Sequence, residues 1–231
     1  LKSRAETALA ALVEGRCEQT PKVFDPVVTD SAFQRSFDPE TRAALLGGAA
    51  MCALAGGDVG SAYRYAKLGA EEPAADGAVW SVRFTLALAT AQPVDATRSF
   101  HVLAKRFPAA LAELDDGLIL TAYQSLAQVP SPEAERLRFL DALTASGWRP
   151  QDPADDASAL KLEHVRLLLA AHRLPEAKRE AAALHSPYAR LSLLVDERFA
   201  AVRSPAPTDP ATVARERLSE LNVLAAVTPV A

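Results

Sequence analysis

An interval of about 34 residues recurs in the middle of this chain and limits what the chain can fold into. Ala96 follows Ala62 at this interval, with Trp80 sixteen residues before Ala96 and Phe100 four residues after it. Recurrence at such an interval is typical of arrays in which one supersecondary unit repeats and buries its apolar face only against its neighbours. The sequence therefore predicts stacked helical hairpins, with the alanines allowing close approach of the second helix of each pair.

Weaker copies of the pattern extend the array in both directions. Ala134 and Ala177 continue the series after Ala96 at wider spacings, which lengthened loops would explain. Towards the N-terminus, Thr20 and Phe24 stand at the small and aromatic positions of a further unit. We expect about five degenerate units in all.

Composition agrees with a helical class and limits the kinds of partner. The chain is 49% hydrophobic but only 6% aromatic and rich in alanine, which favours closely packed helices. Its net charge of −4 is mixed in sign along the chain, so nucleic acid and anionic membrane surfaces are not expected partners. The longest uncharged stretch, residues 43–57, is too short to span a bilayer and is expected to be a buried helix with its turn.

Local signals place several helix ends. Trp80, Phe84 and Ala87 recur on one helical face, which we expect to be buried. Capping side chains are expected at Asp115, at Ser131 before Pro132 and at Asp209 before Pro210, and Gly147 is expected to be a left-handed C-terminal cap. Residues 204–210 are rich in proline and are expected to be a linker, followed over 211–231 by a final helix that caps or projects from the array and by a frayed tail.

The residues that carry the period resemble the tetratricopeptide repeat, most specifically over residues 44–110. They are Trp80, Ala96, Phe100 and Pro108, with Gly57, Ala62 and Pro73 one period earlier. The resemblance implies an all-α fold over residues 1–203, a right-handed superhelix of antiparallel helix pairs with about ten or eleven helices. The sequence departs from the pattern where Arg83 and Phe84 replace the usual Leu-Gly pair and where Pro26 interrupts a second helix. A related superhelical family and an unrelated helical bundle remain alternatives.

The same resemblance implies a binding protein without catalysis. Such proteins generally hold a peptide or protein partner along the concave face of their first helices. The implied groove positions in this sequence are Met51, Ser81, Thr85, Tyr123 and Arg166. The lysine and asparagine with which some members hold a terminal carboxylate are absent at these positions, so apolar contact and scattered hydrogen bonds are expected instead. Met51 could equally be an ordinary core residue.

No catalytic, metal or cofactor constellation supports an enzyme. No two of the four histidines have the i, i+4 spacing that directs two imidazoles to one metal ion. The paired aspartates at 115–116 and 155–156 point about 100° apart on a helix and cannot share a substrate. The "GGDVGS" stretch lacks the lysine of a phosphate-binding loop. We expect no cofactor and no metal ion.

The two cysteines help to predict the cellular compartment of the protein. In the repeat register Cys17 and Cys52 lie at neighbouring helix ends, so a disulfide between them is expected, and two free thiols in a cytosolic protein are the alternative. The chain starts at Leu1 without a charged and apolar leader, as either a processed or a truncated chain would. We therefore expect a periplasmic or exported scaffold, with a cytoplasmic one as the alternative.

Two other functions fit the same sequence. The chain could be the helical accessory region of a larger enzyme. It could also be a self-associating module, in which the final helix after residue 210 docks on a second copy and makes a homo-oligomer.

Overall fold

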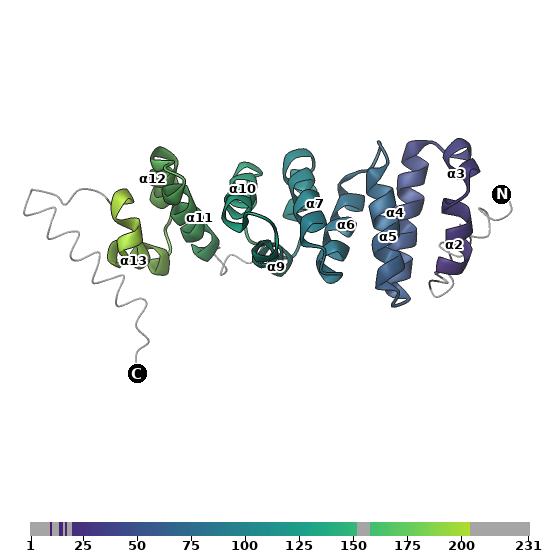
Figure 1. The fold of residues 1–231 in the computed structure, drawn as a ribbon, viewed down its shortest axis with the longest axis horizontal. Helices are drawn as coiled ribbons and strands as arrows, with labels where there is room; N and C mark the ends of the chain where they lie inside the picture. Colours follow the sequence, from purple (N-terminus) through teal and green to yellow (C-terminus); the bar gives the residue numbers. More distant parts are fainter. Residues whose placement is uncertain (1–9, 11–13, 16, 18–19, 152–157, 204–231) are drawn as a thin grey trace, which may run out of the picture. The chain divides into compact units, whose positions relative to one another are not determined.

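The computed structural model describes residues 10, 14–15, 17, 20–151 and 158–203, and within these residues it is all-helical without strands, as predicted (Figure 1). The helices are, in chain order, α2 (Thr20–Val28), α3 (Ser31–Ser36), α4 (Pro39–Ala55), α5 (Val59–Glu71), α6 (Gly77–Ala89), α7 (Pro93–Arg106), α8 (Pro108–Ala112), α9 (Asp116–Ser125), α10 (Pro132–Ala145), α11 (Ser158–Ala170), α12 (Leu174–Ala182) and α13 (Pro187–Val195), with 3-10 helices η2 (Leu126–Gln128) and η3 (Glu197–Val202). The linker and final helix predicted over 204–231 lie outside the described residues.

The chain divides into two compact units. Unit 1 holds residues 1–132 and 142–148, and unit 2 holds residues 133–141 and 149–231, so the boundary falls within α10. The region that we expected to be a single array, residues 1–203, is therefore described as two bodies.

In unit 1 each helix packs on the next in sequence. Figure 1 shows α4, α5, α6 and α7 side by side in chain order, and these neighbours make the main helix contacts of the unit. Helix α6 also contacts α4, two helices before it, and α8 and α9 beyond α7. The apolar face predicted for α6 is buried, with Trp80 6% exposed and Phe84 and Ala87 fully buried.

Three of the four alanines that mark the predicted units are buried. Ala62, Ala96 and Ala177 are each the fourth residue of a helix and are at most 1% exposed. Ala134 is exposed, so this position of the predicted register is wrong. It is the third residue of α10 rather than the fourth, and one residue on a helix turns the side chain by about 100°.

Two of the four predicted helix ends are confirmed, and a third, Asp209, lies outside the described residues. Asp115 caps α9 by accepting a hydrogen bond from the Gly117 amide at 2.8 Å, and Gly147 has φ 72° after α10. Ser131, by contrast, makes no side-chain cap, because it has φ 54° instead of the extended backbone of a capping residue. Pro26 does not interrupt its helix either. Pro26 lacks the N–H that would bond to the Lys22 carbonyl, and α2 continues for two residues beyond it.

The turn between the two helices of a pair is repeated almost identically. In the first copy Gly57 has φ 82° and the Asp58 amide donates to the Ala53 carbonyl; in the second, one period later, Ala91 has φ 52° and the Gln92 amide donates to the Ala87 carbonyl. This is the Schellman arrangement, in which a left-handed residue closes a helix. Unit 2 repeats it at His172, with φ 59°.

The left-handed residue of this turn predicts opposite changes in stability for substitutions at Ala91 and Gly57. A side chain in the left-handed region costs about 1 kcal/mol, so Ala91→Gly should raise the free energy of unfolding by about that amount and Gly57→Ala should lower it similarly. Urea unfolding monitored by circular dichroism measures both. A loss of stability in Ala91→Gly would contradict this account.

Glycines set the closest helix approach in unit 1. A Cβ placed on Gly69 of α5 would lie 3.1 Å from the Leu46 Cβ and 3.3 Å from the Val79 Cγ1, so a methyl group at this meeting point of α4, α5 and α6 would displace its neighbours by a few tenths of an ångström. Gly47 of α4 faces the same valine at 3.2 Å. Val79 therefore occupies space that two glycines leave open.

Two glycines of α5 provide a matched test of this approach. Gly69→Ala should lower the free energy of unfolding by about 1–3 kcal/mol, because the added methyl group overpacks the contact of three helices. Gly60→Ala should raise it by up to about 1 kcal/mol, because Gly60 is exposed and open and alanine is the better helix former. Urea unfolding decides between them, and equal effects at both sites would overturn the packing account.

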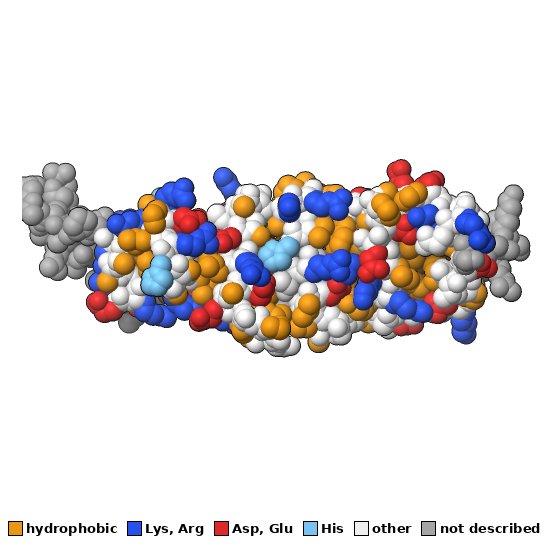
Figure 2. Space-filling view, turned by 45° about the horizontal axis from the view of Figure 1, so that its top comes forward, with side chains coloured by type: hydrophobic (Ala, Val, Ile, Leu, Met, Phe, Trp, Pro, Cys, Tyr) orange, Lys and Arg blue, Asp and Glu red, His pale blue; other side chains and the backbone are white. Residues whose placement is uncertain are grey.

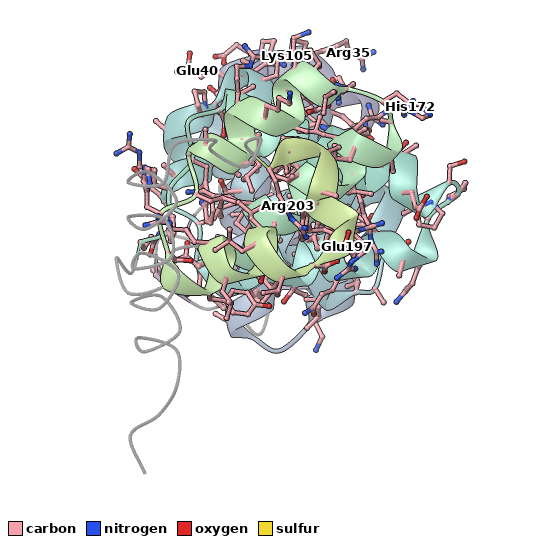
Figure 3. The ribbon with its side chains drawn as sticks, turned by 90° about the vertical axis from the view of Figure 1, so that its left-hand side faces the viewer. Arg35, Glu40, Lys105, His172, Glu197 and Arg203 are labelled. Atoms are coloured by element: carbon pink, nitrogen blue, oxygen red, sulfur yellow. A yellow bond between two sulfur atoms is a disulfide. The ribbon has the colours of Figure 1, made fainter. Side chains whose placement is uncertain are left out.

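Unit 2 has its own core and its own closing contact. The core combines Leu162, Val165, Leu168, Ala177, Ala181, Leu184, Ala189 and Phe199, with Leu137 of α10 packed against it. Arg203 closes the described part of the unit, since its guanidinium donates to the carbonyls of Leu193 at 2.9 Å and Asp196 at 2.6 Å. Figure 3 shows Arg203 beside Glu197, with which it forms an ion pair at 3.4 Å.

Candidate functional site

Three of the predicted groove residues lie on the first helices of two successive pairs in unit 1. Met51 on α4 is 52% exposed, and Ser81 and Thr85 on α6 are partly exposed. Met51 and Thr85 are one period apart, and each stands four residues before the last residue of its helix. The structure therefore places these three side chains where a partner could reach them.

Tyr123 does not fit the predicted role of a surface anchor. It is 9% exposed and belongs to the core of unit 1, while Leu120 and Gln124 are exposed on the same helix. The cause is the displacement that also affects Ala134: α9 begins at Asp116, one residue later than the repeat register assumed. The exposed face of α9 is therefore one residue further along.

Arg166 belongs to α11 of unit 2. Its guanidinium makes two hydrogen bonds to the Glu163 carboxylate, at 2.7 and 2.8 Å, on the same helix. A guanidinium held in this bidentate way is less available to a partner. The groove assigned from the sequence is thus supported by exposure at Met51, Ser81 and Thr85, and not at Tyr123.

A cavity of about 290 Å³ opens in unit 1 between the α6–α7 turn and α9. Nine residues line it: Ala87, Leu88, Ala91, Gln92, Pro93, Thr121, Gln124, Ser125 and Gln128. None of these nine side chains is charged. The sequence did not predict this cavity. Part of its lining comes from the α6–α7 turn and the rest from α9 and η2, and the repeat register of the sequence places the exposed face of α9 one residue too early.

The polar groups of the cavity differ in what they can offer a ligand. The hydroxyls of Thr121 and Ser125 donate back to their own helix, to the carbonyls of Gly117 and Ala122, each at 2.7 Å. The side-chain amides of Gln124 and Gln128 form no hydrogen bond with any other described residue. Gln124 lies on α9 and Gln128 on η2, and each of the two amides can donate and accept.

A buried ion pair fixes the α6–α7 wall of the cavity. The guanidinium of Arg83 on α6 is fully buried and makes two hydrogen bonds to the Asp95 carboxylate on α7, one of them at 3.0 Å. The Tyr63 hydroxyl of α5 donates to the same carboxylate at 2.9 Å. Asp95 therefore joins three helices immediately beside the turn that lines the cavity.

The contacts of Asp95 also set its titration. Burial raises the pKa of the Asp95 carboxyl, but hydrogen bonds from Arg83 and Tyr63 outweigh it and hold that pKa below its ordinary value of 3.8. Burial, together with the bond to Asp95, raises the pKa of Tyr63 to about 12. Because the folded-state pKa of Asp95 is lowered, its stabilising contribution is present above the unfolded pKa and is lost as the pH falls through the folded value.

Replacing the buried carboxylate should therefore destabilise unit 1 strongly. Asp95→Asn leaves the Arg83 guanidinium buried without a counter-charge and should cost about 3–5 kcal/mol at pH 7. It should also reduce the loss of stability on acidification below about pH 4. Glu135→Gln is the matched control in an exposed pair with Arg138, and it should change stability by less than about 1 kcal/mol. Urea unfolding at several pH values tests both, and equal effects would refute the assignment.

A second polar cluster ties helices together in unit 2. Asp141 of α10 lies 3.0 Å from the buried His164 of α11 and accepts a hydrogen bond from Arg173 at 2.6 Å. Arg173 in turn makes two hydrogen bonds to Glu176 of α12. Every member of this chain of contacts has a partner that it holds in place, so we assign it a role in packing.

The predicted disulfide is confirmed. Cys17 and Cys52 are bonded at 2.04 Å, with their Cα atoms 4.6 Å apart. The bond fastens residue 17 to α4 next to Met51, and it links two residues that are 35 positions apart in the sequence.

Other kinds of site find no support in the described part of the chain. No three of its histidine, cysteine, aspartate or glutamate residues are grouped as metal ligands would be. None of its helices is both long and apolar enough to cross a membrane. Figure 2 shows acidic and basic side chains interleaved with apolar ones over the visible surface, without a stripe of one sign.

Comparisons of the chain with protein-family models, with curated proteins and with solved structures gave no match.

Proposed function

We propose that this chain is a tetratricopeptide-like helical scaffold that binds a segment of another protein across α4, α6 and α9. Helix positions support the repeat. Helix α5 begins at Val59 and α7 at Pro93, while α4 ends at Ala55 and α6 at Ala89, and both intervals equal the period found in the sequence. A right-handed superhelix of antiparallel pairs is the arrangement that we propose for these helices.

Contacts between alternate helices support the same arrangement. In a stacked array the first helix of each pair touches the first helix of the next pair, and α6 contacts both α4 and α9. Packing of this kind presents the first helices side by side on one surface, where an extended segment could cross several of them.

The observation that carries the proposal is the exposure of apolar side chains on these first helices. Met51 is 52% and Leu54 36% exposed on α4, and Leu120 is 45% exposed on α9. Leu88 of α6, partly exposed, stands one period after Leu54 and also lines the cavity. Exposed apolar groups that recur in adjacent elements are typical of binding surfaces.

The disulfide supports a compartment outside the reducing cytosol. A disulfide persists in oxidising surroundings, such as the periplasm or the extracellular space. We therefore propose that the scaffold works in an exported or envelope-associated complex.

Site-specific cross-linking tests the proposed face. A photoreactive phenylalanine analogue at Met51 or Thr85, introduced in cells that make the protein, should cross-link to a defined partner. The same analogue at Leu68, which is 40% exposed on the second helix α5, is the matched control and should not. Gel electrophoresis with mass spectrometry identifies the adducts.

The charge variant Leu54→Asp should reduce the yield of that adduct about tenfold or more, because it places a charge in an apolar contact. Leu68→Asp should leave the yield within about twofold. Equal adducts from Leu68 and Met51, or no adduct from any of the three positions, would refute the proposal.

A further inference from the structure

We propose that the cavity between the α6–α7 turn and α9 binds an uncharged, extended peptide segment from within a partner chain, and that it recognises the backbone of that segment. This inference rests on the proposed scaffold function and specifies the chemistry of its ligand. It depends on the lining of the cavity, on its size and on the rigidity of its walls.

The lining argues for an uncharged ligand. The chain carries 25 basic and 29 acidic side chains among 231 residues, yet the nine lining residues include none of them. A terminal carboxylate or a phosphate bound here would lose hydration without gaining a counter-charge. An uncharged segment from the interior of a chain meets no such penalty.

The free amides argue for recognition of the backbone. A glutamine side chain carries the same donor and acceptor groups as a peptide unit and can pair with one through both of them. Gln124 and Gln128 present two such groups four residues apart along α9 and its continuation η2. Gln92 provides a third across the cavity, where its amide makes a hydrogen bond of 3.3 Å to the Thr90 carbonyl.

The size of the cavity and its apolar lining residues favour a ligand that inserts one small apolar side chain. A volume of about 290 Å³ lies at or below the lower end of the range for small-molecule sites, roughly 300–1,000 Å³. Ala87, Leu88 and Pro93 supply apolar surface. The cavity can therefore accommodate one side chain of a peptide while the flanking peptide units meet the glutamines.

The walls of the cavity are held before any ligand arrives. The left-handed conformation of Ala91 and the proline ring at 93 fix the turn, and the ion pair between Arg83 and Asp95 joins the helices on either side of it. Rigid walls reduce the entropy lost on binding. An extended segment can therefore bind there without folding the site.

Selection from a random library tests the ligand class. Dodecapeptides displayed between two folded flanks on phage present no terminus, so only internal segments are sampled. The full chain, with its disulfide intact, should enrich sequences depleted in Asp, Glu, Lys and Arg relative to the input library. Enrichment of charged sequences, or no enrichment over beads without protein, would overturn the inference.

Matched variants then test the site with the enriched peptide, labelled with fluorescein and followed by anisotropy. The double variant Gln124→Ala with Gln128→Ala should weaken binding about tenfold or more. Gln34→Ala, the same exchange at an exposed position of α3 outside the cavity, should change the dissociation constant less than about threefold. Circular dichroism verifies that both variants are folded.

Two further measurements test whether the cavity binds the peptide backbone and whether ion pairs contribute to binding. The same peptide with N-methyl groups at its central amides should lose binding, since it can no longer donate from its backbone. Affinity should be nearly independent of salt from about 0.05 to 0.5 M, since no ion pair contributes. Unchanged binding by the N-methylated peptide, or by the double variant, would overturn the inference even if cross-linking through Met51 had succeeded. Failure of the cross-linking alone would refute the wider scaffold function but not the cavity.

Discussion

Close approach of helices at small side chains is the constraint on which the rest of unit 1 depends. Val79 of α6 fits against Gly47 of α4 and Gly69 of α5, and Ala62 and Ala96 are buried at the same place in successive second helices. Protein interiors leave no space for an added methylene group without displacement. Ala62 and Ala96, which stand 34 residues apart in the sequence, are thus both buried positions of this packing.

The interior of unit 1 also contains a charged pair, Arg83 and Asp95, and the contacts of these two side chains explain why it is tolerated. Arg83 stands where the tetratricopeptide pattern has an apolar pair, and it is fully buried. Its cost of desolvation is offset because Asp95 accepts two hydrogen bonds from it in a bidentate geometry and accepts a third from Tyr63. The guanidinium also lies 5.1 Å from the centre of the Trp80 ring, which favours a cation. Arg83, which departs from the tetratricopeptide pattern, thus belongs to a hydrogen-bonded cluster that links α5, α6 and α7.

Sequence reasoning predicted the parts of the fold that depend on local pattern. The helical class, the buried face at Trp80 and Phe84 and the disulfide all follow from residue type and spacing, and all are confirmed. The exposed face of α9 was not predicted correctly, since the alanine chosen as the repeat marker, Ala134, lies one residue away from the buried position. A one-residue displacement changes no composition and no period, yet it exchanges Tyr123 for Gln124 on the surface. The cavity could not be predicted for the same reason, because it needs the correct face of one helix against a turn from another pair.

The left-handed conformation of Ala91 does not by itself mark a functional site. Ala91 lines the cavity in a left-handed conformation that glycine adopts without cost at Gly57, which could suggest that the strain itself marks a site. His172 argues otherwise, because it adopts the same conformation in a turn of unit 2 with the same hydrogen bonds. A side chain other than glycine is therefore tolerated in this turn generally. What distinguishes the α6–α9 region is instead its lining, because two exposed glutamine side chains, Gln124 and Gln128, stand at an uncharged cavity where their amides can pair with a ligand.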